Sequence, residues 1–236
     1  MTFVILVRHA HSSANAEQVL SGRREGVHLS DLGRKQAAKL SKRLGLTNIK
    51  ALRSSPLVRC EETIAPWIKF RAESAERDET LKIPKLRIDE GLSEVDYGLW
   101  SGEKLRKLSK DPLWKTIQEA PSRVIFPEGE SLRAVQERAM IAVESALTVR
   151  GKGSILLISH GDVLKSIVAG SLNLDLDEFQ RIVIDPASIS ILDFSGARAR
   201  VILLNDSRSS VEIDSESRRS KGPLVGGGSG LLRRLK

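Results

Sequence analysis

Two short apolar segments, far apart along the chain, each lead directly into a histidine. The first, Phe3–Val7, has the length and β-branched content of a buried strand, and it is followed by Arg8 and His9. The second, residues 154–159, is also largely apolar and is followed by His160. Both segments therefore predict central strands of a sheet. Because two such strands can bring two imidazole rings to one edge of that sheet, the pair suits covalent phosphoryl transfer through a histidine.

Helical and extended patterns alternate along the rest of the chain. Apolar positions repeat with helical spacing over residues 31–44, with Ser30 as the predicted N-cap and Gly45 as the C-terminal stop. Further strands are predicted at 49–53, 86–88, 188–193 and 200–204, and further helices from Pro56 onward, over 131–149 and over 163–172. Residues 71–85, rich in Glu, Arg and Lys, are predicted to form a solvated loop. The alternation indicates an α/β fold built in layers.

Composition bears on the domain organisation. The chain has 236 residues, of which 40% are apolar, so it can bury a substantial core. From Asp206 onward the composition changes to Ser, Arg and Gly. We therefore predict one domain over residues 1–205, followed by a disordered tail over residues 206–236.

Charge and cysteine content narrow the choice of partners. Residues 1–60 carry eleven Lys and Arg against three Asp and Glu, which can attract nucleic acid, acidic lipid or a small anionic substrate. Aromatic residues make up 4% of the chain and are not interleaved with these basic residues, which argues against a base-stacking surface. Cys60 is the only cysteine, so an internal disulfide is excluded, and Phe3–Val7 is too short for a signal segment or a membrane span. We expect a cytoplasmic protein with a small anionic substrate and without nucleic-acid or membrane partners.

Four short motifs occur in a distinctive order. They are Arg8-His9 after a strand, Arg59 after Ser54-Ser55-Pro56, Glu94 within Leu92–Gly98, and Ser159-His160-Gly161. Each motif is weak alone, but in this order they resemble the histidine phosphatase superfamily, also called phosphoglycerate mutase-like, over residues 3–204. The resemblance is nearest to the actinobacterial-type proteins named phosphoglycerate mutase or phosphatase. It implies a three-layer α/β sandwich with a mostly parallel central sheet flanked by helices.

The resemblance also implies a role for five residues, and the chemistry of each residue type agrees with it. His9 is expected to be the nucleophile, because a neutral imidazole offers a lone pair near neutral pH. Arg8 and Arg59 are expected to hold phosphoryl oxygens with planar, permanently charged guanidinium groups. His160 is expected to donate to the transferring group, where charge develops. Glu94 is expected to protonate the alkoxide leaving group and then to help deprotonate water.

Additional phosphate or substrate contacts are implied at positions that match the family outside these five. The residues concerned are Asn15, Ser21, Gly22, Arg23 and Gly161. Gly161 stands at the predicted start of a helix, where backbone N–H groups favour anions. No metal is expected, because the four histidines and the single cysteine show no zinc-ligand spacing. No cofactor is expected either, and a homodimer formed through an edge strand is left open.

Departures from the family pattern bear on the reaction. Ala10 stands where glycine is usual, and His11-Ser12 stands where Glu-Thr is common. Between residues 98 and 127 there is no adjacent arginine pair of the kind that holds the second acid group in phosphoglycerate mutases; the nearest basic residues are Lys104, Arg106 and Lys107. The expected activity is therefore phosphomonoester hydrolysis. A 2,3-bisphosphoglycerate-dependent phosphoglycerate mutase and a non-catalytic module that binds phosphorylated ligands or nucleic acid are the alternatives.

Several of these residues also have a purely structural interpretation. The alternatives are carbonyl-bonded core histidines at positions 9 and 160, an ion pair from Arg59 to Glu61 or Glu62, and Asp96 in place of Glu94 as the proton donor. Structural roles are predicted for His11 in the pocket wall, for His28 in a loop and for Cys60 in helix packing. Ser131 and Asp162 are predicted helix N-caps. Glu130 is predicted to be a first-turn acid, with a lesser chance of reaching the substrate.

Overall fold

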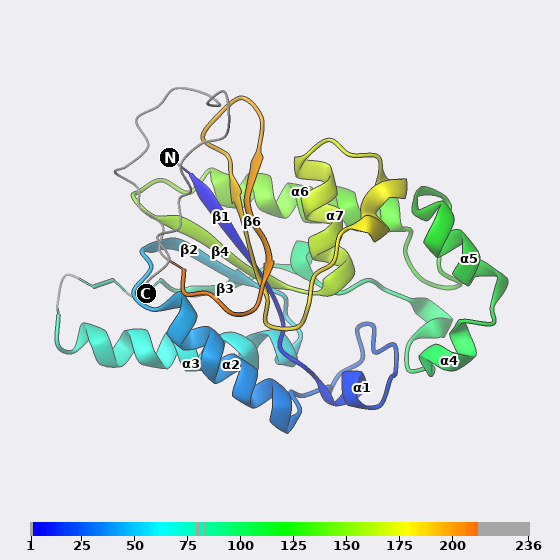
Figure 1. Cartoon of the computed structure of the whole chain (residues 1–236), viewed down its shortest axis with the longest axis horizontal. Helices are drawn as coiled ribbons and strands as arrows, with labels where there is room; N and C mark the ends of the chain where they lie inside the picture. The colour runs from blue at the N-terminus through cyan, green and yellow to red at the C-terminus, as the bar shows by residue number, and fades with distance from the viewer. Residues whose placement is uncertain (1, 79–80, 83, 212–236) are drawn as a thin grey trace.

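The fold is organised around one mixed β-sheet. The structure, a computed structural model, describes residues 2–78, 81–82 and 84–211 (Figure 1). In this part of the chain the sheet has six strands in the order β3-β2-β4-β1-β5-β6. The strands are β1 (Phe3–Arg8), β2 (Ile49–Ser54), β3 (Leu86–Ile88), β4 (Ser154–Ser159), β5 (Ile189–Asp193) and β6 (Arg200–Asp206). β3, β2, β4 and β1 run parallel, whereas β5 and β6 pair antiparallel, so the predicted mostly parallel sheet is confirmed.

Helices cover both faces of the sheet, which gives the predicted three layers (Figure 1). The α-helices are α1 (Ser13–Ala16), α2 (Asp31–Leu44), α3 (Val58–Ala75), α4 (Leu105–Leu108), α5 (Pro112–Glu119), α6 (Leu132–Leu147) and α7 (Gly161–Ser171). Short 3-10 turns are η1 (Glu90–Leu92), η2 (Gly98–Trp100), η3 (Pro121–Arg123) and η4 (Leu176–Arg181). α2 and α3 lie against one face, and α6 and α7 lie against the other.

The apolar strands are buried on both faces because their side chains alternate between two cores. On β1, Val4 and Leu6 join the core under α6 and α7, whereas Phe3, Ile5 and Val7 join the core under α2 and α3. Strand β4 divides its side chains between the same two cores. The continuous apolar pattern of both segments therefore marks central strands, as the sequence predicts.

The predicted ends of two helices are confirmed by their caps. The Ser30 hydroxyl accepts a hydrogen bond from the N–H of Gly33 at 3.1 Å, which starts α2. Gly45 ends α2 with a φ of 49°, a conformation that glycine adopts without steric cost. The Ser131 hydroxyl caps α6 in the same way as Ser30 caps α2.

The segment around α3 differs from the prediction. The helix begins at Val58, after Pro56, and it runs to Ala75, so residues 71–75 are helical although a loop was expected there. A buried stripe of Cys60, Ile64, Trp67 and Arg71 continues through this charged sequence at helical spacing. The guanidinium of Arg71 lies 5.8 Å from the centre of the Trp67 ring, so an arginine stem occupies a core position.

Two further boundaries are corrected. α7 starts at Gly161, and its N-cap is His160, so Asp162 is a first-turn residue and not the predicted N-cap. Strand β6 includes Asp206, and Val211 is buried against the core under α2 and α3. The packed part of the chain thus extends past residue 205, and the rest of the predicted tail, residues 212–236, lies outside the described residues.

No helix within the described ranges combines the length and the apolar character needed to cross a membrane.

Candidate active site

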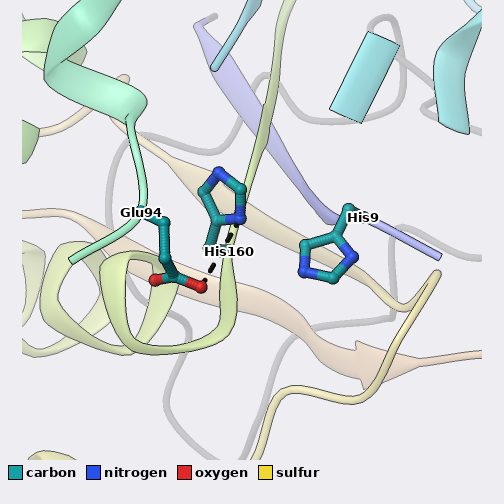
Figure 2. Close-up of side chains that lie close together, drawn as sticks. All are labelled: His9, Glu94 and His160. Atoms are coloured by element: carbon teal, nitrogen blue, oxygen red, sulfur yellow. Dashed lines mark ion pairs between the residues drawn. The ribbon is translucent and has the colours of Figure 1, made fainter. Parts of the chain in front are cut away.

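The two predicted histidines meet at the carboxyl edge of the sheet. Strands β1 and β4 are parallel neighbours, and Arg8 pairs with Ser159 in their register. His9 and His160 follow those two residues, and the centres of their rings lie 5.1 Å apart (Figure 2). The N–H of His9 also donates to the carbonyl of Ser159 at 2.9 Å. In α/β sheets the carboxyl ends of parallel strands are the usual location of a ligand site.

The environment of His9 fixes its tautomer and its charge. Nδ1 lies 2.8 Å from the carbonyl oxygen of Ala10. Because a carbonyl can only accept, Nδ1 carries the proton and Nε2 keeps the lone pair. Burial lowers the pKa of His9 well below its ordinary value, and the positive charges of Arg59 and Arg8 lower it further. His9 is therefore a neutral imidazole with a free lone pair at neutral pH.

His160 is fully buried and is held on one side only. Its Nε2 lies 2.7 Å from the hydroxyl oxygen of Ser55 and 3.5 Å from the sulfur of Cys60. Its Nδ1 has no hydrogen-bond partner within the described residues and forms a longer ion-pair contact of 3.5 Å with Glu94 (Figure 2). Burial, Arg59 and His9, in that order, lower the pKa of His160 well below its ordinary value. This ring is neutral as well.

Glu94 completes the cluster as a buried carboxyl group. It follows η1, is 8% exposed, and accepts a hydrogen bond from the N–H of Val95 at 3.0 Å. Burial raises the pKa of Glu94 to about 7, although the charge of Arg59 acts in the opposite direction. The negative charge of Asp162 adds to the rise. Glu94 can therefore hold a proton near neutral pH.

Arg8 and Arg59 bring two guanidinium groups to the cluster. Arg8 donates from Nη1 to the carbonyl of Ile184 at 2.6 Å, and Arg59 donates from Nη2 to the carbonyl of Gly22 at 2.9 Å. Arg59 lies 3.9 Å from Glu94 in their ion pair. Among the described residues, Arg8 Nε and Arg59 Nε and Nη1 are buried without a hydrogen-bond partner. Buried donors are normally satisfied, so these nitrogens indicate a place for an acceptor.

Within the described residues, the structure does not show the ion pair from Arg59 to Glu61 or Glu62 that the sequence left open as an alternative. Instead, Glu62 accepts from the backbone N–H of Leu29 at 2.8 Å and contacts His28 at 2.6 Å. The carboxyl of Glu62 therefore secures the loop before α2, and Arg59 is left for the cluster.

A second set of charges surrounds the backbone of Glu94. Arg23 donates from Nε to the carbonyl of Glu94 at 2.8 Å and from Nη2 to Glu130 at 2.8 Å. Arg138 donates to the same carbonyl at 3.1 Å and to Glu130 at 2.7 Å. Glu130 also accepts from the N–H of Asp96 at 2.8 Å. Arg23 is thus placed beside the backbone of Glu94, and its predicted contact with substrate stays a prediction.

Sequence reasoning missed Arg138 and predicted Glu130 mainly as a first-turn acid with a lesser chance of reaching the substrate. The first-turn assignment is wrong, because α6 starts at Leu132 with Ser131 as its N-cap. Arg138 lies on α6, where a single arginine on a polar helix face carries no local signal. Glu130 precedes Ser131, so its position resembled that of an ordinary acid near a helix N-terminus. Their ion pair joins residues close in the sequence, but their contacts with the Glu94 segment arise from long-range packing.

The structure places the glycines of the site close to its arginines. A Cβ atom on Gly161 would lie 3.2 Å from Cζ of Arg8, so a side chain there would crowd the guanidinium. Gly22 has a φ of +52°, and its carbonyl accepts from Arg59. Ser21 precedes Gly22 in the same loop. Asn15 is engaged locally, since its Oδ1 accepts from the N–H of Ser12 at 3.0 Å.

The remaining polar candidates have structural contacts. His11 lies 2.8 Å from the hydroxyl of Ser30, beside the start of α2. Asp162 accepts a hydrogen bond from the hydroxyl of Tyr97 at 2.9 Å. Cys60 is buried in α3, and burial raises the pKa of its thiol to about 12. A neutral thiol of this kind packs against its neighbours and is a poor nucleophile.

His9, Glu94 and His160 could in principle hold a metal ion, since their ligand atoms lie within 4.8 Å of one another. The charges of Arg8 and Arg59 act on the same site, and both lower the pKa of His9. A positive field that disfavours a proton on an imidazole also disfavours a metal cation bound to that imidazole. The electrostatics of the cluster favour an anion.

The comparisons with known proteins agree with this geometry. A profile of the histidine phosphatase superfamily (branch 1) matches residues 4–207. Phosphoserine phosphatase 1 of Hydrogenobacter thermophilus is 29% identical over 212 residues, which cover 87% of this chain and 92% of that protein. The probable phosphoglycerate mutase GpmB of Cronobacter sakazakii is also 29% identical, over 82% of this chain and 86% of that protein. The solved structure of YhfR from Bacillus stearothermophilus has a TM-score of 0.74 and 27% identity, covering 87% of this chain and 98% of that chain.

The chain belongs to the histidine phosphatase superfamily. It is therefore an enzyme of the phosphatase class, and its α/β fold with a mostly parallel sheet is that of this family.

The raised pKa of Glu94 predicts a link between pH and stability. Its pKa is about 7 in the folded protein against an ordinary 4.5, so the folded state binds this proton more tightly. The resulting stabilisation is fully present below pH 4.5 and is lost as the pH rises through 7. Relative to Glu94→Gln, the wild-type free energy of unfolding is expected to fall by on the order of 3 kcal/mol over this range. Urea denaturation of both proteins across this pH range measures their free energies of unfolding. If the two free energies changed with pH in parallel, Glu94 would not be a buried carboxyl with a raised pKa.

Proposed function

We propose that this protein hydrolyses small phosphomonoesters through a covalent phosphohistidine on His9. The observation that carries the proposal is the set of buried nitrogens without partners around His9 in the described part of the chain: Arg8 Nε, Arg59 Nε and Nη1, and His160 Nδ1. A buried donor without a partner costs about 1–3 kcal/mol, and more if it is charged. The oxygens of a phosphoryl group supply the acceptors that these donors lack.

In the first step, Nε2 of His9 attacks phosphorus and a P–N bond forms. The P–O bond to the leaving alkoxide breaks, and neutral Glu94 gives its proton to that oxygen. Arg8, Arg59 and His160 hold the phosphoryl oxygens while charge develops on them. The tautomer of His160 that suits this role has its proton on Nδ1 and accepts from the Ser55 hydroxyl at Nε2.

In the second step, water is the acceptor. The carboxylate of Glu94, now deprotonated, takes a proton from water as the water oxygen attacks phosphorus. The P–N bond breaks, inorganic phosphate is released, and His9 and Glu94 return to their starting protonation states. Burial favours neutral forms of His9, His160 and Glu94. The cycle therefore ends with these groups in the protonation states in which it begins.

Water is favoured over a second substrate hydroxyl by the residues around α4. Lys104 donates to the carbonyl of Glu17 at 3.0 Å, and Lys107 pairs with Glu103 at 2.9 Å. Arg106 is exposed on α4. Both lysines thus make surface contacts, with Glu17 and Glu103, and neither forms part of an arginine pair that could hold a second acid group. The phosphoglycerate mutase alternative retains support from the resemblance to GpmB.

The covalent step is tested by trapping. Wild-type protein mixed with p-nitrophenyl phosphate and quenched in alkaline denaturant is expected to carry a phosphoryl group that is stable in base and labile in acid. His9→Ala should abolish both this adduct and phosphate release while circular dichroism stays unchanged. His28→Ala is the matched control, because His28 is exposed and contacts Glu62. Ligand binding that survives His9→Ala, without any wild-type turnover, would instead indicate a non-catalytic binding module.

The role of Glu94 is tested with two leaving groups. Glu94→Gln is expected to lose about 10²–10⁴-fold in kcat/KM on an alkyl phosphate, whose alkoxide needs a proton. On p-nitrophenyl phosphate the same variant should still release p-nitrophenol in a first, stoichiometric turnover and then accumulate phosphoenzyme, since water activation is lost. Asp96→Asn is the matched control and tests the alternative donor. The assignment is wrong if Asp96→Asn, rather than Glu94→Gln, shows this pattern.

Hydrolase and mutase are separated by product analysis. With 3-phosphoglycerate as the substrate, release of inorganic phosphate is expected to exceed formation of 2-phosphoglycerate, both with and without added 2,3-bisphosphoglycerate. The two products are measured by a phosphate assay and by nuclear magnetic resonance. Isomerisation faster than phosphate release would establish the mutase instead.

A further inference from the structure

Residues 184–188, which follow η4 and are called the 184–188 loop below, contact both Arg8 and His9. The carbonyl of Ile184 accepts from Nη1 of Arg8 at 2.6 Å. The N–H of Ala187 is shared between the carbonyls of Arg8, at 3.2 Å, and His9, at 3.3 Å. The N–H of Arg8 in turn donates to the carbonyl of Ser188 at 3.4 Å. The loop is thus attached to the backbone and to the guanidinium of this Arg-His pair.

Ala187 is held in a backbone conformation that it would not adopt freely. Its φ is +58°, in the left-handed region, which is sterically unfavourable for an L-residue with a side chain. Such a conformation persists where the surrounding structure holds it. Ala187 is buried, and its carbonyl accepts from Nη1 of Arg43 at 3.1 Å.

Arg43 joins this carbonyl to the end of the described chain. Its side chain comes from α2 and is 9% exposed. Nε donates to the carbonyl of Ser209 at 2.9 Å, and Nη2 donates to the carbonyl of Asp206 at 2.7 Å and to its carboxylate at 3.2 Å. The carbonyl of Arg43 accepts from the N–H of Val211 at 2.9 Å. One buried guanidinium therefore connects α2, the 184–188 loop and residues 206–209.

Asn205 holds the same loop from the end of β6. Its Oδ1 accepts from the N–H of Asp185 at 2.6 Å, and its Nδ2 donates to the carboxylate of Asp185 at 2.9 Å. Asn205 also has a positive φ, of 54°, a conformation that asparagine tolerates better than most residues. Asn205 and Arg43 contact different residues of the loop, so either contact can be removed separately.

We infer that Arg43 and Asn205 are positioning residues for phosphoryl transfer, acting through the 184–188 loop on Arg8 and His9. The inference rests on the proposed function of His9 as nucleophile. Nη1 of Arg8 is held by Ile184, and its Nε is buried without a partner in the described part of the chain, so Nε is free to donate to the proposed phosphoryl group. A displacement of about 1 Å at such a centre can cost on the order of 10²-fold in rate. Neither positioning residue touches the substrate.

The experiment measures the chemical step in the full-length protein. The measured quantity is the rate of single-turnover p-nitrophenol release at saturating p-nitrophenyl phosphate, at a temperature well below the melting temperature of each protein. The proteins compared are wild type, Arg43→Met, Arg43→Lys and Asn205→Gly. Arg43→Met is expected to lower this rate roughly ten- to hundredfold with little change in half-saturation. Arg43→Lys should fall between Arg43→Met and wild type, because it keeps the charge and one donor. Asn205→Gly keeps a permissive backbone, loses the side-chain bonds, and should also be slower.

Leu40→Val separates positioning from stability. Leu40 is buried on α2 in the core under α2 and α3, so this variant is expected to lower the melting temperature without altering the rate. The inference is overturned if folded Arg43→Lys and Asn205→Gly react at the wild-type rate. It is also overturned if Leu40→Val slows the reaction as much as the Arg43 variants do for the same loss of stability. Failure of wild type itself to form a phosphoenzyme on His9 would overturn the proposed function, and this inference with it.

Discussion

The parallel pairing of β1 with β4 is the constraint on which the site depends. Its register sets Arg8 opposite Ser159, and the two following residues are the histidines of the cluster. A shift of one residue along β1 would exchange the side chains that face the two cores, because the side-chain period of a strand is two. Both faces of β1 are buried in different apolar cores, so such a shift is strongly disfavoured. The packing of apolar side chains on β1 and β4 therefore fixes the distance between the rings of His9 and His160.

The same burial determines the protonation states at the site. It lowers the pKa of both histidines and raises the pKa of Glu94, since in each case it disfavours the charged form. A neutral imidazole and a protonated carboxyl can thus be present together near neutral pH. The guanidinium groups of Arg8 and Arg59 supply the positive field for an anion. Burial thus favours neutral forms of both histidines and of Glu94.

Much of the fold follows from local patterns in the sequence, whereas the outer part of the site does not. Apolar segments such as Phe3–Val7 reveal central strands because they must be buried on both faces. The serine caps of α2 and α6 are short-range interactions and are equally visible. The end of α3 was missed because Arg71 fills a core position with an apolar stem, which a charge-based pattern assigns to solvent.

Long-range contacts explain what sequence reasoning missed at the site. The ordered motifs indicated His9, Glu94 and His160, and the strand topology brings them together. Glu130 and Arg138 contact the distant Glu94 segment, so no local pattern distinguishes them from ordinary surface residues. The segment after residue 205 has a polar composition typical of a tail, yet Val211 and the acceptors for Arg43 make its first residues part of the packed domain.

Under the proposed function, the hydrogen-bond donors on Arg8, Arg59 and His160 have a thermodynamic consequence for the whole molecule. An oxyanion that accepts hydrogen bonds from them binds only the native state, so its binding free energy adds directly to the free energy of unfolding. At a concentration one hundred times its dissociation constant, a ligand of this kind contributes about 2.7 kcal/mol. A fall in the concentration of the proposed phosphate-ester substrate would therefore also lower the free energy of unfolding of the enzyme.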